Sequence, residues 1–136
     1  MNVWIIVLII IAGIYLFFHV KSHGSKVGAA KNALLAKYTF SRIDSKTQSK
    51  VLDRTRDILR SGGIRDATEK LQTLSERERY GFYALAMAEL GIPPALGNET
   101  WQYVRNPFAA LIRAESHIAA SQNDLKNKYG VDITME

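Results

Sequence analysis

The sequence contains no cysteine. Disulfide bonds, thiolate nucleophiles and cysteine-ligated zinc or iron–sulfur centres are therefore excluded, although this absence leaves the redox compartment undetermined. There is also no nucleophile motif, no phosphate-binding glycine loop and no dense cluster of carboxylates. The consecutive residues Glu115, Ser116 and His117 would point in different directions on a helix, so they form no catalytic relay. The 136 residues leave room for one modest domain, and we predict no catalytic residue, no enzymatic activity and no cofactor.

Charged residues are missing from the first twenty positions, where Val3–Val20 reads VWIIVLIIIAGIYLFFHV. As a helix this stretch would rise about 27 Å, close to the hydrocarbon thickness of a bilayer. It has no polar face, and Trp4 and Tyr15 lie near its two ends, where aromatic rings favour the membrane boundary. A cleavable signal peptide is disfavoured because no basic residue precedes the run and no A-x-A site follows it. We therefore predict that residues 1–20 are a transmembrane anchor, contacting membrane lipid through residues 3–20.

Basic residues begin only after this apolar run. The positive-inside rule then places the amino terminus outside and the carboxy-terminal domain in the cytoplasm. Residues 21–60 contain ten basic and three acidic side chains, and a basic residue close to anionic headgroups contributes about 1 kcal/mol. The predicted lipid-binding residues are Lys21, Lys26, Lys31 and Lys37. A solvated helix face is the alternative explanation for this charge.

The rest of the chain shows helical spacing of apolar residues and no alternating pattern long enough for a sheet. Residues 21–44 are interpreted as a basic juxtamembrane amphipathic helix and linker, which either hinges at Ser22–Ser25 or continues the anchor. Residues 45–136 are predicted to form the soluble domain. Its first helix opens with a capping box at Ser45–Gln48 and ends at the glycine pair 62–63. The predicted class is all-α: one transmembrane helix, then a domain of about five helices in a hairpin-like arrangement.

Start and stop signals divide the remainder of that domain. A short helix is expected over residues 64–74, followed by a capping box at Ser75–Glu78. The helix that this box opens runs to Leu90 with almost no polar face, so we predict that it is the hub of the fold. Asn106 caps the longest helix outside the membrane, and Gly130 ends it.

His19 and His23 are spaced i, i+4, which would project both imidazoles from one face of a continuous helix. Two ligands alone make a weak metal site, and the only other histidine, His117, is far along the chain. The better interpretation is that both histidines lie at the membrane boundary and bind no ligand, so we predict no bound metal.

Nucleic acid is not a predicted partner. The helix that begins near Ser45 has a basic side of the kind that phosphates favour. The residues on that side are Lys46, Lys50, Arg54 and Arg56. Asp53 and Asp57 are interleaved with them, and the helix has no aromatic residue on which a base would stack.

Three aromatic residues lie close together in the sequence, at Trp101, Tyr103 and Phe108. Aromatic residues are frequent hot spots of protein interfaces, so we predict that these three bind a partner, with burial in the domain's own core as the alternative. The expected function is a single-pass membrane-anchored protein-interaction domain, either an accessory subunit of a membrane complex or an adaptor that recruits a partner. The alternative is an exported helical domain that binds a ligand or envelope component, tethered by an uncleaved signal anchor.

Overall fold

The computed structural model describes residues 3–104 and 115–135, and of residues 11–27 and 115 it describes the backbone alone. Within these residues all regular structure is helical, which confirms the all-α class. The helices are α1 (Val3–Phe40), α2 (Ser45–Ser61), α3 (Ala67–Thr73), α4 (Glu76–Glu89) and α6 (Glu115–Tyr129). In the described part of the chain, no helix combines the length and the apolar content that crossing a membrane requires.

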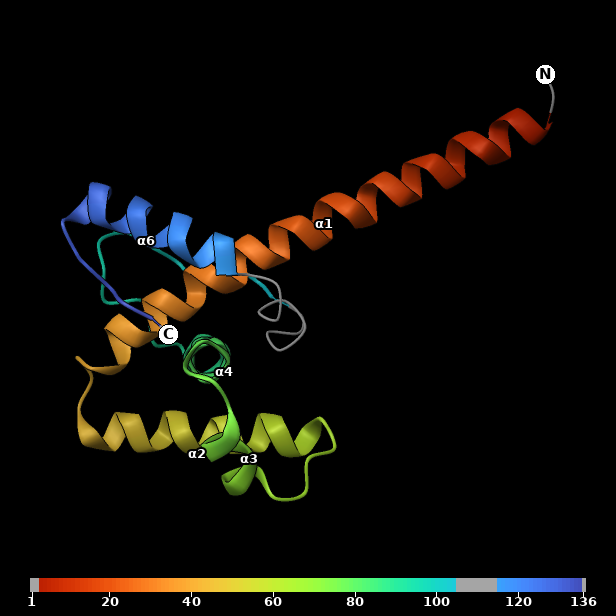
Figure 1. The fold of residues 1–136 in the computed structure, drawn as a ribbon. Coiled ribbons are helices and arrows are strands. Elements are labelled where there is room, and N and C mark those ends of the chain that lie inside the picture. The colour runs from red at the N-terminus through yellow and green to blue at the C-terminus, as the bar shows by residue number, and fades with distance from the viewer. Residues whose placement is uncertain (1–2, 105–114, 136) are drawn as a thin grey trace.

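Helix α1 is continuous over 38 residues, so its axis is about 57 Å long. It runs through Ser22–Ser25 without a break, so of the two arrangements that the sequence allowed, a hinge or a continuous helix, the structure has the continuous helix. Its amino-terminal part projects away from the other helices, whereas its carboxy-terminal part lies among them (Figure 1).

The core forms around the last third of α1. Its apolar residues there are nearly inaccessible to solvent: Ala29, Ala30, Ala33, Leu34, Leu35 and Ala36. One cluster of buried residues joins this part of α1 to α6 and the carboxy-terminal segment, and a second joins it to α2, α3 and α4. The helices therefore stack in the order α6, α1, α4, α2 (Figure 1). The sequence-based choice of α4 as the hub needs correction, because α1 is the helix that links both clusters.

Helix α4 follows its predicted signals closely. The Ser75 hydroxyl accepts a hydrogen bond from the Glu78 backbone N–H at 3.3 Å and donates one to the Glu78 carboxylate at 2.8 Å, which confirms Ser75 as the N-cap and its pairing with Glu78. At the other end Gly91 has a φ of +73°, and the Ile92 N–H reaches back to the Met87 carbonyl at 2.9 Å.

Helix α2 begins at Ser45, but its N-cap is not the residue that the sequence predicted. The Asp44 carboxylate accepts a hydrogen bond from the Thr47 N–H at 2.7 Å, so Asp44 is the N-cap and Ser45 is the first helical residue. Hydrogen bonds from the Thr47 side chain and then from its backbone N–H lower the pKa of Asp44 below its usual value. Helix α3 is shorter than expected, because Asp66 caps it and accepts from the Glu69 N–H at 3.0 Å.

Residues 92–104, here called the crossing segment, return across α1 without helical structure. The Ala95 N–H donates to the Thr39 hydroxyl at 2.9 Å, and Gln102 pairs with Asn32, 70 residues away in sequence. The segment therefore runs from the carboxy-terminal end of α1 towards the point where α1 leaves the domain.

Candidate functional site

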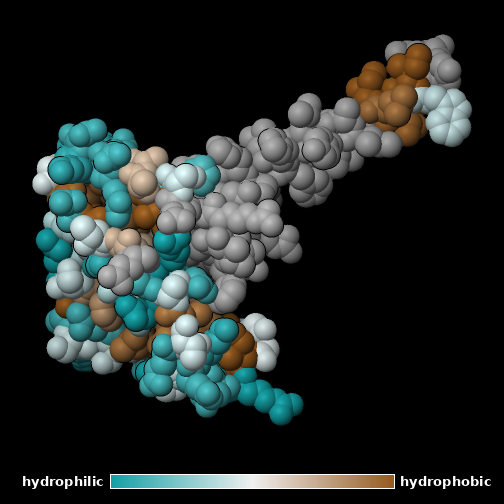
Figure 2. All heavy atoms as spheres, in the orientation of Figure 1, coloured by the Kyte–Doolittle hydropathy of each residue, from teal (hydrophilic) through white to brown (hydrophobic). Residues whose placement is uncertain are grey.

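The amino-terminal end of α1 exposes only apolar side chains. Every residue from Val3 to Ile10 is between 40% and 74% exposed. Eight consecutive residues of a helix cover more than two turns, so the apolar surface goes all the way round. Figure 2 shows it as a hydrophobic tip separated from the mixed surface of the domain.

The apolar side chains of this tip are not packed against other parts of the described structure that would remove them from water. Fully burying a valine, leucine, isoleucine or similar side chain contributes about 1.5–3 kcal/mol, so eight residues that are 40–74% exposed together forgo on the order of 10 kcal/mol. A contiguous exposed apolar surface of this kind is typical of contact with a membrane or another protein. The hydrophobic tip (Val3–Ile10) is therefore the first candidate functional surface.

A cleft of about 200 Å³ lies between α1, α4 and the crossing segment. It is lined by small residues of α1 and α4, among them Ala29 and Ala84, and by the larger side chains of Leu85 and Trp101. The surface of the cleft is largely apolar. Small residues on a helix let another chain approach its backbone closely, so the cleft is the second candidate surface.

The three aromatic residues predicted to bind a partner have different surroundings. Trp101 is half-buried, packs against both core clusters and donates its indole N–H to the Ile92 carbonyl at 2.6 Å. Tyr103 also lines the cleft, but its side chain is 81% exposed. Phe108 lies outside the described residues.

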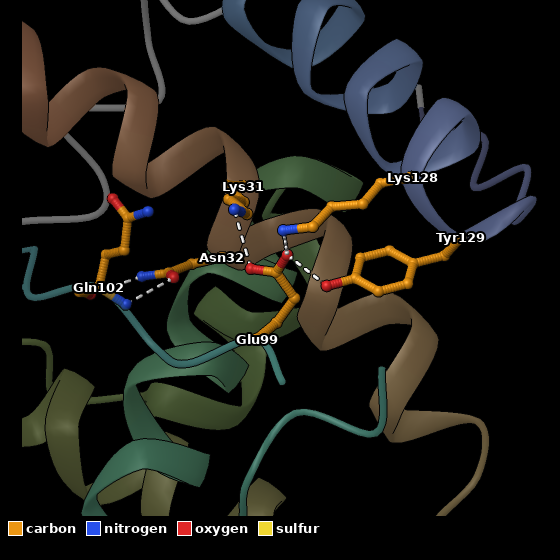
Figure 3. A network of polar contacts seen from close by, with 6 residues as sticks. All are labelled: Lys31, Asn32, Glu99, Gln102, Lys128 and Tyr129. Carbon is orange, nitrogen blue, oxygen red and sulfur yellow. Dashed lines mark hydrogen bonds and ion pairs between the residues drawn. The ribbon is translucent and has the colours of Figure 1, made fainter. Parts of the chain in front are cut away.

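Two polar clusters hold the crossing segment in place, and the first is centred on Glu99 (Figure 3). Its carboxylate pairs with Lys31 of α1 at 2.8 Å and with Lys128 of α6 at 3.1 Å, and it accepts a hydrogen bond from the Tyr129 hydroxyl at 2.8 Å. The hydrogen bond from Lys31 lowers the pKa of Glu99 to about 2, and the bonds from Tyr129 and Lys128 act in the same direction, although partial burial opposes them. Glu99 thus ties the crossing segment to two helices.

The second cluster is the pair formed by Asn32 and Gln102 (Figure 3). The Asn32 amide donates to the Gln102 carbonyl at 2.7 Å and accepts from the Gln102 N–H at 3.0 Å. Because both backbone groups of Gln102 are held, the positions of its neighbours Trp101 and Tyr103 are fixed relative to α1. Sequence reasoning missed both Asn32 and Glu99; the available signal for Asn32 was a polar residue inside the alanine-rich apolar run of α1.

The lysines predicted to bind lipid also divide into two groups. Lys31 pairs with Glu99, and Lys37 pairs with Glu76 and donates to the Thr134 carbonyl, so both ammonium groups are engaged within the domain. Lys21 and Lys26 lie in α1, and their side chains are outside the described part of the structure. Lipid binding remains a prediction for these last two.

The predicted histidine pair also lies in α1, where only the backbone of His19 and His23 is described. Among the described residues there is no group of three or more histidine, aspartate or glutamate side chains arranged to hold a metal ion.

Comparisons of the chain with protein-family models, with curated proteins and with solved structures found no match. The hydrophobic tip of α1 and the cleft beside Trp101 are therefore the features of the structure that bear on function.

Proposed function

We propose that this protein is anchored in a membrane by a single helix, residues 3–20, and that its helical domain binds another protein at the cytoplasmic face. It would act there as an accessory subunit of a membrane complex or as an adaptor. The observation that carries the proposal is the all-round exposure of the hydrophobic tip on a helix that continues into the domain core. The sequence supports it further, because residues 3–20 contain no charged side chain and would rise about 27 Å as a helix.

The continuity of α1 has a geometric consequence under this proposal. Gly28, the first residue after the anchor whose burial in the domain is described, is eight residues after Val20, so it would lie about 12 Å beyond the hydrocarbon edge. The headgroup layer is roughly 5–8 Å deep, since the whole bilayer is about 40–45 Å thick and its hydrocarbon core about 30 Å. The domain would therefore be held just outside the headgroups.

The cleft is the surface that we assign to the protein partner. Its sides are pre-organised, because Trp101 is fixed by its bond to Ile92 and the neighbouring backbone by Asn32. A preformed site loses less conformational entropy when a partner binds. Tethering beside the bilayer raises the effective concentration of any partner that resides in the same membrane.

The anchor is tested by placing charge in the hydrophobic tip. An arginine near the centre of a membrane helix costs about 2.5–3.5 kcal/mol, so Ile9→Arg with Ile10→Arg should cost at least about 5–7 kcal/mol of insertion free energy. The matched control adds two arginines to exposed positions of the domain, Ser61→Arg and Leu90→Arg. We expect wild type and control to pellet with alkali-washed membranes and the tip variant to remain in the supernatant. Wild-type protein in the supernatant would refute the anchor.

Orientation and partner binding need separate measurements. A protease-cleavable tag after Glu136 should resist protease added outside intact cells if the domain is cytoplasmic, whereas cleavage would favour the exported alternative.

A photo-crosslinking residue at Ala88, in the cleft, should capture a defined protein that the same group at Asp57, on the exposed face of α2, does not capture. Equal capture from both positions would refute the assignment of the cleft.

A further inference from the structure

We propose that the ring of Tyr103 lies in the phospholipid headgroup layer and orients the domain on the membrane surface. The inference rests on the proposed anchor and extends it from residues 3–20 to the domain itself. Tyr103 is one of two large apolar side chains that the described part of the domain leaves exposed, and at 81% it is far more exposed than Leu90 at 41%.

The place of Tyr103 in the fold points to the membrane. Its neighbours Gln102 and Val104 lie directly over Gly28: a Cβ atom on that glycine would be 2.8 Å from the Gln102 amide oxygen and 3.6 Å from a Val104 methyl carbon. Gly28 is the amino-terminal end of the part of α1 whose packing in the domain is described. Tyr103 therefore lies towards the end of the domain from which the amino-terminal part of α1 projects (Figure 1).

The height of this position matches the headgroup region. Gly28 follows Val20 by eight residues, so along a continuous helix it lies about 12 Å from the hydrocarbon edge. The headgroups fill roughly 5–8 Å of that distance. The remaining few ångströms are within the length of a tyrosine side chain, and tilting of α1 shortens the gap.

The chemistry of the residue suits this location. Tyrosine has an apolar ring and a polar hydroxyl, and it is enriched at both membrane–water boundaries for that reason. The other tyrosines whose side chains are described are buried or half-buried: Tyr38, Tyr80, Tyr83 and Tyr129. The exposure of Tyr103 also does not come from a loose chain end, because both backbone groups of the preceding residue are held by Asn32.

The absence of cysteine from the chain allows a direct measurement of depth. Three single-cysteine variants of the full chain, Tyr103→Cys, Ile10→Cys and Asp57→Cys, are labelled with a small environment-sensitive fluorophore. Each is placed in phosphatidylcholine vesicles that carry a nitroxide either on the headgroup or near the end of the acyl chain. We expect the label at position 103 to lose more fluorescence to the headgroup nitroxide, and the label at position 10 to lose more to the acyl-chain nitroxide. Position 57 should be quenched only by aqueous iodide.

The possible outcomes separate the two proposals. If position 10 is deep but position 103 behaves like position 57, the inference about Tyr103 fails, the anchor stands, and Tyr103 returns to the set of residues available to a protein partner. If position 10 itself escapes the acyl-chain nitroxide, the proposed membrane anchor fails. Unfolding of the Tyr103→Cys variant is excluded when its far-ultraviolet circular dichroism matches wild type, as an exposed position should allow.

Discussion

Replacing Glu99 by glutamine tests whether one carboxylate joins the crossing segment to both α1 and α6. The amide has nearly the same shape as the carboxylate, so the packing around it is retained. The substitution removes the negative charge that faces Lys31 and Lys128. The Tyr129 hydroxyl still has an oxygen to which it can donate.

The size of the effect follows from the shift in the pKa of Glu99. Its pKa is lowered from the ordinary 4.5 to about 2, and one pKa unit corresponds to about 1.36 kcal/mol. The full shift would give about 3 kcal/mol, but the Lys128 end of the cluster is exposed to solvent, which screens the charges. We therefore expect Glu99→Gln to lower the free energy of unfolding by about 1–2 kcal/mol near neutral pH.

The pH dependence has a definite sign. A carboxyl group whose pKa is lower in the folded state stabilises the fold fully above its unfolded pKa, and this contribution disappears as pH falls through the folded pKa. The difference between wild type and Glu99→Gln should thus be constant above about pH 4.5 and decline to nothing near pH 2. Urea titrations of the full chain in a mild detergent measure it, with Trp4→Phe in every variant so that Trp101 is the only fluorescent indole.

The matched control is Glu89→Gln, because Glu89 pairs with Arg54 at the surface, where both side chains are well exposed. An exposed pair contributes about 0.2–1 kcal/mol, so the control should lie within that range. Equal losses from the two variants would contradict a special role for Glu99. A Glu99→Gln difference that stayed constant down to pH 2 would show that the effect does not come from its charge.

Two further predictions concern the same part of the fold and use the same urea titrations. Gly97→Ala should lower the free energy of unfolding by at least about 1 kcal/mol more than Gly91→Ala. Both glycines have positive φ, but a Cβ on Gly97 would overlap the Tyr129 ring, whereas a Cβ on Gly91 would meet open space. Equal losses from the two variants would contradict this packing. Asn32→Ala leaves two part-buried backbone groups of Gln102 without their partner and should cost about 2–3 kcal/mol, and a loss below about 0.5 kcal/mol would mean that water replaces the amide.

The sequence predicted the features that depend on neighbouring residues. The N-cap at Ser75 and the stop at Gly91 were identified because each needs only a few adjacent residues and a backbone preference. The start of α2 near Ser45 is confirmed, but its cap was assigned to the wrong residue, since Asp44 and Ser45 are both good N-cap residues and the choice between them depends on the loop after α1.

The polar clusters escaped prediction because their members are far apart in the sequence. Lys31 carries the same charge as Lys21 and Lys26 and lies in the same basic stretch, so nothing local distinguishes it from a lipid-facing lysine. Its partner Glu99 becomes visible only when the crossing segment is folded back over α1. The same holds for Asn32, whose partner lies 70 residues away.

Whether the apolar amino-terminal segment and the core share one helix was left open, because Gly24 and its neighbours permit either a hinge or a continuous helix. The difference matters for function. If the eight residues 21–28 were a flexible linker, their ends would be roughly 15 Å apart on average and the domain would be free to rotate. A continuous helix instead fixes the distance between Val20 and Gly28 at about 12 Å and holds the domain in one orientation. Under the proposed anchor, a flexible linker would make contact between Tyr103 and lipid occasional, whereas a continuous helix would keep the crossing segment facing the bilayer. A glycine-rich replacement of residues 21–28 should therefore lower headgroup quenching at position 103 while leaving the depth of position 10 unchanged.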